Sequence, residues 1–298
     1  SLYYNTTGCL NSAFGCHALF KNTTATYNTA VGADALYCNT TGGANAAFGY
    51  GAMYYNTTGQ NNTGIGVEAL KSNTTAAYNT AVGKCALGKN TTGAYNTASG
   101  FYALLCNTTA GQNTASGYVA LKNTTTGSAN TASGFYALYA NTTGTLNSAF
   151  GHATLVANTT GGCNLAVGQC SLASNTTGSY NTASGKSALK SNTTGARNDA
   201  FGARSLEANT TGQYNTASGY YAAQCGTTAQ QNIAIGSFAM RFNTTGNYNT
   251  AVGVSALRYS NHANAKDNVA IGHSALYTST TGACNTAVGS AALYKSTT

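Results

Sequence analysis

A glycine recurs along this chain with a step of seventeen residues, and no other feature constrains the fold as strongly. It closes the phrase Asn-Thr-Ala-Val-Gly or a close variant. With one step of nineteen before the last two copies, the marker glycines are Gly15, Gly32, Gly49, Gly66, Gly83, Gly100, Gly117, Gly134, Gly151, Gly168, Gly185, Gly202, Gly219, Gly236, Gly253, Gly272 and Gly289. A fixed short period means that one small structural unit stacks on copies of itself. The sequence therefore predicts one uninterrupted repeat array over residues 1–298, with a two-residue insertion near residues 260–266.

Positions in each repeat are numbered from the marker glycine, so that position −4 lies four residues before it. Position −4 is Asn in every copy, and position −2 is Ala except at Gly64. Position +4 is Leu except at Met53, Ala223 and Met240. Because these positions hardly vary, we expect them to be architectural, and we expect any specific contact with a partner at the variable positions.

The period also decides between helix and strand. A helical repeat needs two helices of about ten residues each, and hence a period above about thirty. Glycine in the middle of every copy also opposes a helix. The sequence therefore predicts an all-β fold, a parallel β-solenoid or β-roll of seventeen 17-residue coils, with two or three short strands in each coil. The chain contains no Pro, which agrees with a coil whose backbone N–H groups must nearly all donate to a neighbouring coil.

The invariant positions acquire distinct roles in such a stack. We expect the alanines at positions −2 and +3 where two backbone walls come close, and the leucines at +4 in a continuous stripe. We expect the marker glycine and the glycine of Asn-Thr-Thr-Gly to take positive φ. The Asn at position −4 is expected to form a ladder of stacked amides. Its members are Asn11, Asn28, Asn45, Asn62, Asn79, Asn96, Asn113, Asn130, Asn147, Asn164, Asn181, Asn198, Asn215, Asn232, Asn249, Asn268 and Asn285.

The core of one such coil is thin. Successive strand residues point to opposite faces, so apolar residues are expected both inside the coil and on an outer face. The outer face would need a partner. We therefore expect lateral association into a homo-oligomer, with three-fold order.

Two copies, at residues 231–236 and 267–272, read Gln-Asn-Ile-Ala-Ile-Gly and Asp-Asn-Val-Ala-Ile-Gly. This phrase resembles the head repeat of trimeric autotransporter adhesins, and the fuller unit resembles arrays in bacterial surface fibres and phage-type tail fibres. The period is longer than in the usual head repeat, and position −1 is Ser at Ser99, Ser116, Ser133, Ser184 and Ser218. The resemblance implies a left-handed, trimeric β-roll in an extracellular stalk or head, with no catalytic residues.

The triplet Asn-Thr-Thr is an acceptor sequence for N-glycosylation. The alternative is turn chemistry, because Asn and Thr side chains hydrogen-bond nearby backbone in turns. Glycans on every coil would stand only about 5 Å apart. The candidate acceptors are Asn5, Asn22, Asn39, Asn56, Asn73, Asn90, Asn107, Asn123, Asn141, Asn158, Asn175, Asn192, Asn209 and Asn243.

Catalytic chemistry finds little support. Acidic residues and histidines recur at no fixed position, whereas a general acid and base must reach one substrate atom. The nine cysteines show no Cys-x-x-Cys metal spacing, although Cys9 with Cys16 and Cys163 with Cys170 could form disulfides across a coil. We expect no enzyme activity, no metal and no cofactor. The insertion is the one site-like segment, with His262, Lys266 and Asp267 as a candidate binding loop and a harmless bulge as the alternative.

The sequence therefore predicts a structural and adhesive segment of an extracellular fibre, the stalk or head of a surface adhesin or a tail fibre. The chain begins and ends in mid-repeat, and we expect it to be a piece of a longer fibre. Expected partners are further copies of the chain and a host-surface glycan or protein. Nucleic acid is not expected, because the net charge of +8 is spread thinly, nor is membrane insertion of this segment. The alternatives are an ice-binding or other surface-binding β-solenoid and a glycosylated environmental filament.

Overall fold

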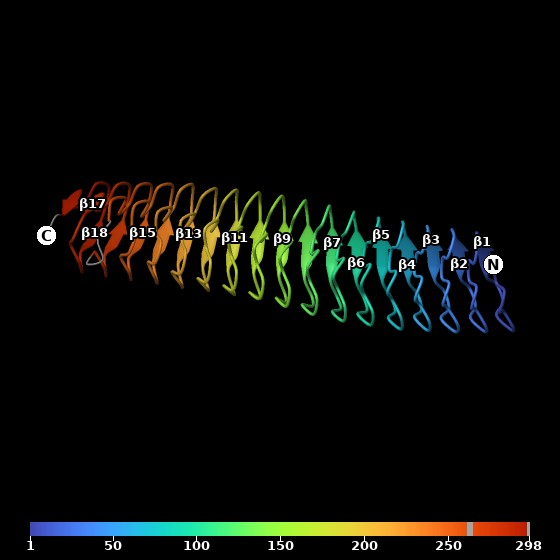
Figure 1. Ribbon diagram of the computed structural model, residues 1–298. Coiled ribbons are helices and arrows are strands. Elements are labelled where there is room, and N and C mark those ends of the chain that lie inside the picture. The colour runs from blue at the N-terminus through green and yellow to red at the C-terminus, as the bar shows by residue number, and fades with distance from the viewer. Residues whose placement is uncertain (261–264, 297–298) are drawn as a thin grey trace. The chain divides into compact units, whose positions relative to one another are not determined.

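The structure is a computed structural model that describes residues 1–260 and 265–296 (Figure 1). It is an all-β parallel β-solenoid of about 17 coils, as the period predicts, and no helix occurs in the described residues. The chain divides into unit 1, residues 1–147, and unit 2, residues 148–298.

Unit 1 contains one three-residue strand in each coil. Each strand pairs in parallel with the strand of the next coil, in a register that sets equal positions side by side, for example Ala30 beside Ala47. The strands are β1 Ser12–Phe14, β2 Thr29–Val31, β3 Ala46–Phe48, β4 Thr63–Ile65, β5 Thr80–Val82, β6 Thr97–Ser99, β7 Thr114–Ser116 and β8 Thr131–Ser133.

Unit 2 repeats this arrangement and adds a short second ladder between β17 and β19. Its strands are β9 Ser148–Phe150, β10 Leu165–Val167, β11 Thr182–Ser184, β12 Asp199–Phe201, β13 Thr216–Ser218, β14 Ile233–Ile235, β15 Thr250–Val252, β16 Val269–Ile271, β17 Thr278–Ser279, β18 Thr286–Val288 and β19 Lys295–Ser296. Most coils thus carry one strand, whereas we expected two or three. Elsewhere in the coil, hydrogen bonds such as Leu36 N to Ala52 O (3.0 Å) join neighbouring coils without continuous strand geometry.

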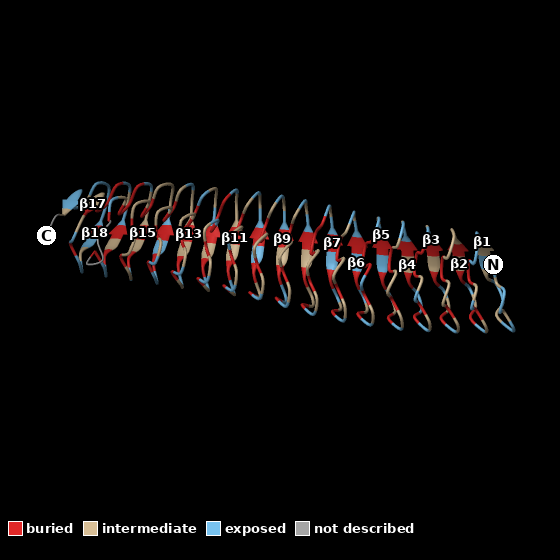
Figure 2. Ribbon diagram, in the orientation of Figure 1, coloured by how far each residue is buried: buried red, intermediate tan, exposed pale blue. Residues whose placement is uncertain are grey.

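The core is formed by the small and apolar invariant positions. The middle residue of almost every three-residue strand is buried, and so are the alanines at +3 and the side chains at +4 except in the last copy, where Ala292 is half-buried and Leu293 is exposed (Figure 2). Two sequence exceptions compensate each other. Met53 replaces Leu, and its Cε lies 3.1 Å from where a Cβ of Gly64 would stand. Glycine at position 64 therefore makes room for the longer methionine in the coil before it.

Backbone conformation departs from expectation at two positions. The marker glycines do take positive φ, for example 133° at Gly32, where a Cβ would lie 2.6 Å from the carbonyl oxygen of Gly49. The glycine of Asn-Thr-Thr-Gly does not, and Ala25 occupies the same position in another coil, so this site needs a small residue rather than positive φ. The leucines, in contrast, lie in the left-handed region, as at Leu36 with φ 51°. This conformation costs about 1–3 kcal/mol per residue and persists because hydrogen bonds to the next coil hold it.

Candidate functional site

The asparagines at position −4 form a hydrogen-bonded ladder within each unit, which we call the strand ladder. In unit 1 the backbone N–H of each member donates to Oδ1 of the member one coil earlier, as from Asn45 to Asn28 at 2.9 Å. The side-chain Nδ2 donates to a carbonyl oxygen in the next coil, as from Asn28 to Gly42 at 2.9 Å. The same pattern links Asn164 to Asn181 and continues to Asn285 in unit 2. This ladder therefore stabilises the interior of the coils by joining each coil to its neighbours.

The asparagines of the Asn-Thr-Thr triplets form a second ladder at position −10, the turn ladder. Asn39 Nδ2, for example, donates to Asn22 Oδ1 at 3.1 Å and to Gly42 O at 2.9 Å. The side chains are buried, with at most 2% of their surface exposed, at Asn22, Asn39, Asn56, Asn73, Asn90, Asn107, Asn141, Asn158, Asn175, Asn192, Asn209 and Asn243. A glycan on one of these nitrogens would displace these hydrogen bonds, which are the kind that the turn-chemistry alternative expects. Glycosylation at these residues stays a prediction.

Two other acceptor sequences differ. Asn5, in the first coil, and Asn123 are half-buried rather than buried. Asn123 lies one residue before position −10, and Thr124 occupies that position. The hydrogen bond from Asn141 Nδ2 to Thr124 Oγ1 is therefore long, at 3.4 Å. The turn ladder is weakened there, and Asn107 Oδ1 is buried without a partner. Asn209 Oδ1 is orphaned in the same way, because the next coil carries Gly226.

Two outward-facing files of side chains run from coil to coil. The strands present position −1, where Phe48, Ile65 and Val82 are exposed by 38%, 40% and 38%. Position −8, which is the second threonine of most triplets, forms another file, exposed at Thr7, Thr24, Thr41, Thr58, Thr75, Thr92, Thr109, Thr126 and Thr143 in unit 1. The first threonine is different, since its hydroxyl donates to the next coil, as from Thr40 to Thr57 O at 3.1 Å. The variable side chains at position −1 and the threonine hydroxyls are thus exposed at regular intervals along the coils.

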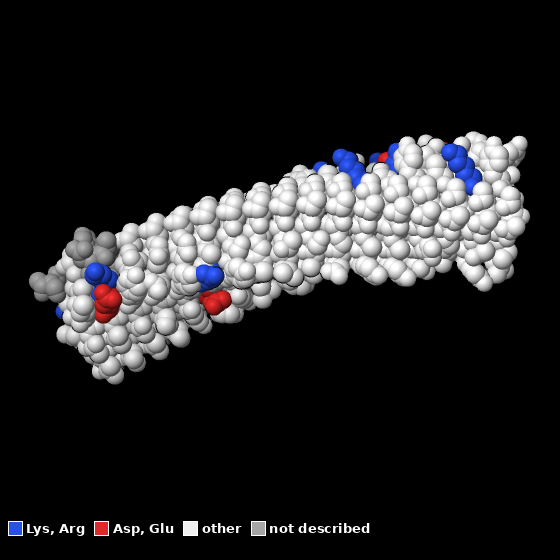
Figure 3. All heavy atoms as spheres, turned by 90° about the horizontal axis from the view of Figure 1, so that it is seen from below, with Lys and Arg blue, Asp and Glu red and all other residues white. Residues whose placement is uncertain are grey.

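Charged residues are sparse on the face seen in Figure 3, where they stand apart on an uncharged surface. Of the candidate binding loop, His262 lies outside the described residues. Lys266 and Asp267 are exposed, and their backbones join neighbouring coils, with Cys284 N donating to Lys266 O at 3.0 Å. No ion pair links the two charged groups in the described part of the chain.

The cysteines all carry free thiols, including the two pairs considered as disulfides, Cys9 with Cys16 and Cys163 with Cys170. Cys85 is buried, and burial is the main cause that raises the pKa of its thiol, with a contact to Glu68 adding to the shift.

Aromatic rings stack along position +5 at the start of unit 1. The centroids of Phe20 and Tyr37 are 5.2 Å apart, and those of Tyr37 and Tyr54 are 5.0 Å apart with an interplanar angle of 1°. The stack ends at Tyr54, because the next coil carries Lys71 at this position. In unit 2 guanidinium groups take part in similar stacking, with Arg241 Cζ lying 4.6 Å from the centroid of the Tyr221 ring.

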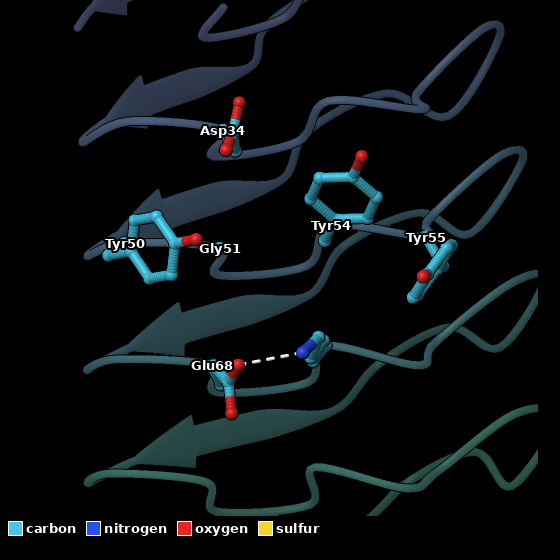
Figure 4. A pocket seen from close by; sticks show the side chains of 7 residues that line it. Asp34, Tyr50, Gly51, Tyr54, Tyr55 and Glu68 are labelled. Atoms are coloured by element: carbon cyan, nitrogen blue, oxygen red, sulfur yellow. Dashed lines mark hydrogen bonds and ion pairs between the residues drawn. The ribbon is translucent and has the colours of Figure 1, made fainter. Parts of the chain in front are cut away.

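A hollow of about 250 Å³ lies beside the end of this aromatic stack. It is lined by Asp34, Tyr50, Gly51, Tyr54, Tyr55, Glu68 and Lys71. Its origin is a single glycine at position +2. Asp34 and Glu68 occupy this position in the coils before and after, and the tyrosines are spread along the coil of Gly51 between them (Figure 4). At every other copy of position +2 a non-glycine residue takes positive φ, as at Asp34 (57°) and Glu68 (57°), so Gly51 at 61° is a vacant side-chain place and not a backbone requirement.

Glu68 and Lys71 form an ion pair in the hollow. Lys71 Nζ donates to Glu68 Oε1 at 2.6 Å, and this hydrogen bond lowers the pKa of Glu68 and raises the pKa of Lys71. Burial is the main cause that raises the pKa of the Tyr54 phenol. His17 Nδ1 lies 3.2 Å from Asp34 Oδ1. At neutral pH the hollow therefore offers the Glu68 carboxylate as an acceptor, the Lys71 ammonium as a donor and the protonated Tyr54 phenol.

The prediction that acidic residues and histidines recur at no fixed position was wrong, because His17, Asp34 and Glu68 all occupy position +2, and this site was missed for that reason. Aligning position +2 across the copies shows one glycine, Gly51, between two carboxylates. The exposed rings of Tyr50 and Tyr55 come from positions +1 and +6 of the same copy.

Comparison with protein-family models, curated proteins and solved structures finds no match for this chain. In the part of the chain that the structure describes, no helix is long and apolar enough to cross a membrane. Nor do three or more His, Cys, Asp or Glu side chains gather there in a group that could hold a metal ion.

Proposed function

We propose that this chain is a structural and adhesive segment of an extracellular fibre, on a cell surface or a virion, and that it performs no catalysis. The observation that carries the proposal is the separation of roles between positions. The invariant Asn, Ala and Leu are buried, whereas the variable positions −1, +1 and +6 mostly point outward. Such a coil is a stiff spacer that presents chosen side chains at regular intervals.

The fibre is proposed to be a left-handed homotrimer whose strand faces cover one another. The support is the exposed apolar file at position −1, which includes Phe48, Ile65 and Val82. Mass photometry and electron microscopy of the purified chain test this, with particles of three chains expected. Val82→Lys should then release single chains, whereas Thr92→Lys on the threonine file should not. Single chains in the unmodified protein would contradict the trimer.

A second candidate is an ice-binding or other surface-binding solenoid. The exposed threonine file of unit 1 favours it, because its members repeat at the coil spacing of about 4.8 Å. Thermal hysteresis in a freezing assay, reduced by Thr75→Lys, would support this function over a fibre, and its absence would remove the candidate. A third candidate is a glycosylated filament, for which Asn5 and Asn123 are the half-buried acceptors, and an unmodified intact mass after secretion from a glycosylating host would exclude it.

A further inference from the structure

We propose that the hollow beside Gly51 is a binding site for a neutral pyranose sugar of a glycan. This inference rests on the proposed adhesive function and deepens it, because it names the chemical class of ligand. The site is local to unit 1, and all its residues come from three successive coils.

The shape of the hollow comes from the missing side chain. Asp34 and Glu68 stand two coils apart, with Cα atoms separated by about 10 Å at the spacing of parallel strands. Between them a Cβ on Gly51 would have Glu68 Cγ, at 3.9 Å, as its one neighbour within 4 Å. The volume of about 250 Å³ has room for one sugar ring between the two carboxylates.

The lining matches the polar edge and the apolar face of a pyranose. Sugar hydroxyls can donate to the carboxylates and accept from Lys71 and the tyrosine phenols. Ring C–H groups need an aromatic surface. Tyr50 and Tyr55 are 57% and 48% exposed, and Tyr54 is the last ring of its stack, followed by Lys71 instead of another ring. Figure 4 shows these three rings spread along one coil, with Glu68 and its partner amine on the next.

Other ligand classes fit less well. The two carboxylates repel phosphate and sulfate, which disfavours nucleic acids and acidic glycans. A cationic ligand would compete with Lys71, which already holds Glu68 at 2.6 Å. Hydrolysis of the sugar is not expected, because a glycosidase needs a carboxylic acid with a raised pKa, whereas the pKa of Glu68 is lowered.

Saturation-transfer NMR with the whole chain tests the site. The probes are methyl glycosides of glucose, galactose and mannose, with N-acetylneuraminic acid and oligo-dT as comparators. A single small sugar in an open site should bind with a Kd on the order of 1 mM. Glu68→Gln, which removes the charge and keeps the shape, should weaken binding about tenfold.

The decisive variant fills the hollow. Gly51→Phe places a ring where Phe238 stands at position +2 of another coil, with φ 61° at both residues. It should abolish sugar binding and leave the fold intact, as checked by circular dichroism. The matched control, Ala153→Phe, makes the same change at position +2 of a coil in unit 2 and should bind as the unmodified protein does.

Absence of binding to all three neutral sugars overturns the proposal. So does binding that Gly51→Phe leaves unchanged, or a preference for the acidic sugar or for oligo-dT. These results are separable from those of the fibre proposal, because particle size and chain number are measured without any sugar. A chain that forms fibres and binds no sugar would refute this site alone.

Discussion

Replacing Gly226 by Asn should repair a break in the turn ladder and stabilise unit 2. Asn209 Oδ1, one coil earlier, is buried without a partner. Asn243 Nδ2, one coil later, donates to Gly246 O at 2.9 Å and otherwise approaches the Met240 sulfur at 4.0 Å. A new Asn can donate to Asn209 Oδ1 and accept from Asn243 Nδ2, as Asn192 does in an intact stretch of the ladder.

The size of the effect follows from these contacts. An unsatisfied buried acceptor costs about 1–3 kcal/mol. Replacing a glycine whose φ is not positive raises the free energy of unfolding by about 0.4–1 kcal/mol, because it restricts the unfolded chain. Against this, a Cβ at Gly226 meets Asn243 O at 3.1 Å, and ordering the new side chain costs up to about 1 kcal/mol. We expect a net stabilisation of about 1–3 kcal/mol.

The control is Gly226→Ala, which meets the same close contact and restricts the unfolded chain without supplying an amide. It should change the stability by less than about 1 kcal/mol in either direction. Because solenoids can unfold by parts, the measurement should be local as well as global. Native-state hydrogen exchange at Thr210 and Thr227, whose N–H groups donate to the next coil at 2.9 and 3.0 Å, reports the opening of these coils. Urea unfolding gives the global value.

Exchange in the Asn variant that is no slower than in the Ala variant would show that the new amide does not repair the turn ladder. An independent repeat of the experiment exists in unit 1, where Thr124→Asn should satisfy Asn107 Oδ1. If Gly226→Asn stabilises the chain and Thr124→Asn does not, the gain at Gly226 comes from the backbone and not from the ladder.

Three further predictions concern unit 1. Leu87→Ala should cost about 2–5 kcal/mol in urea unfolding, because Leu87 is fully buried in a thin core; a cost below 1 kcal/mol would mean that the leucine stripe is not the core. Cys85 should react with iodoacetamide far more slowly than the exposed Cys9, since it is buried and its pKa is raised, and mass spectrometry of timed samples would show equal rates if this is incorrect. The pKa of Glu68 is lowered in the folded chain, so its stabilising contribution is present above its unfolded pKa of about 4.3 and is lost as the pH falls through the folded value. Wild type should therefore lose slightly more stability than Glu68→Gln between pH 7 and pH 3, by up to about 1 kcal/mol for this half-buried pair, and identical losses would argue against the Lys71 contact.

The sequence by itself determined the solenoid, its coils and most of its core. A period of seventeen residues is too short for a pair of helices and long enough for one coil, so the repeat length alone predicted the fold class. The positions that hardly vary, such as those of Asn28, Ala30 and Leu36, are buried because stacking places each copy against its equivalents. That logic needs no knowledge of the path of the chain within a coil.

Only the tertiary structure decided the path inside each coil. The left-handed φ of Leu36 cannot be predicted from the residue type, because hydrogen bonds to the next coil impose it. The burial of Asn39 turns a glycosylation sequence into a ladder, because the triplet faces inward at that corner. The hollow beside Gly51 arises between side chains contributed by three coils, so its chemistry depends on which positions the stacking makes neighbours. The local sequence therefore sets the chemistry of each side chain, and the stacking of coils determines which other side chains it contacts.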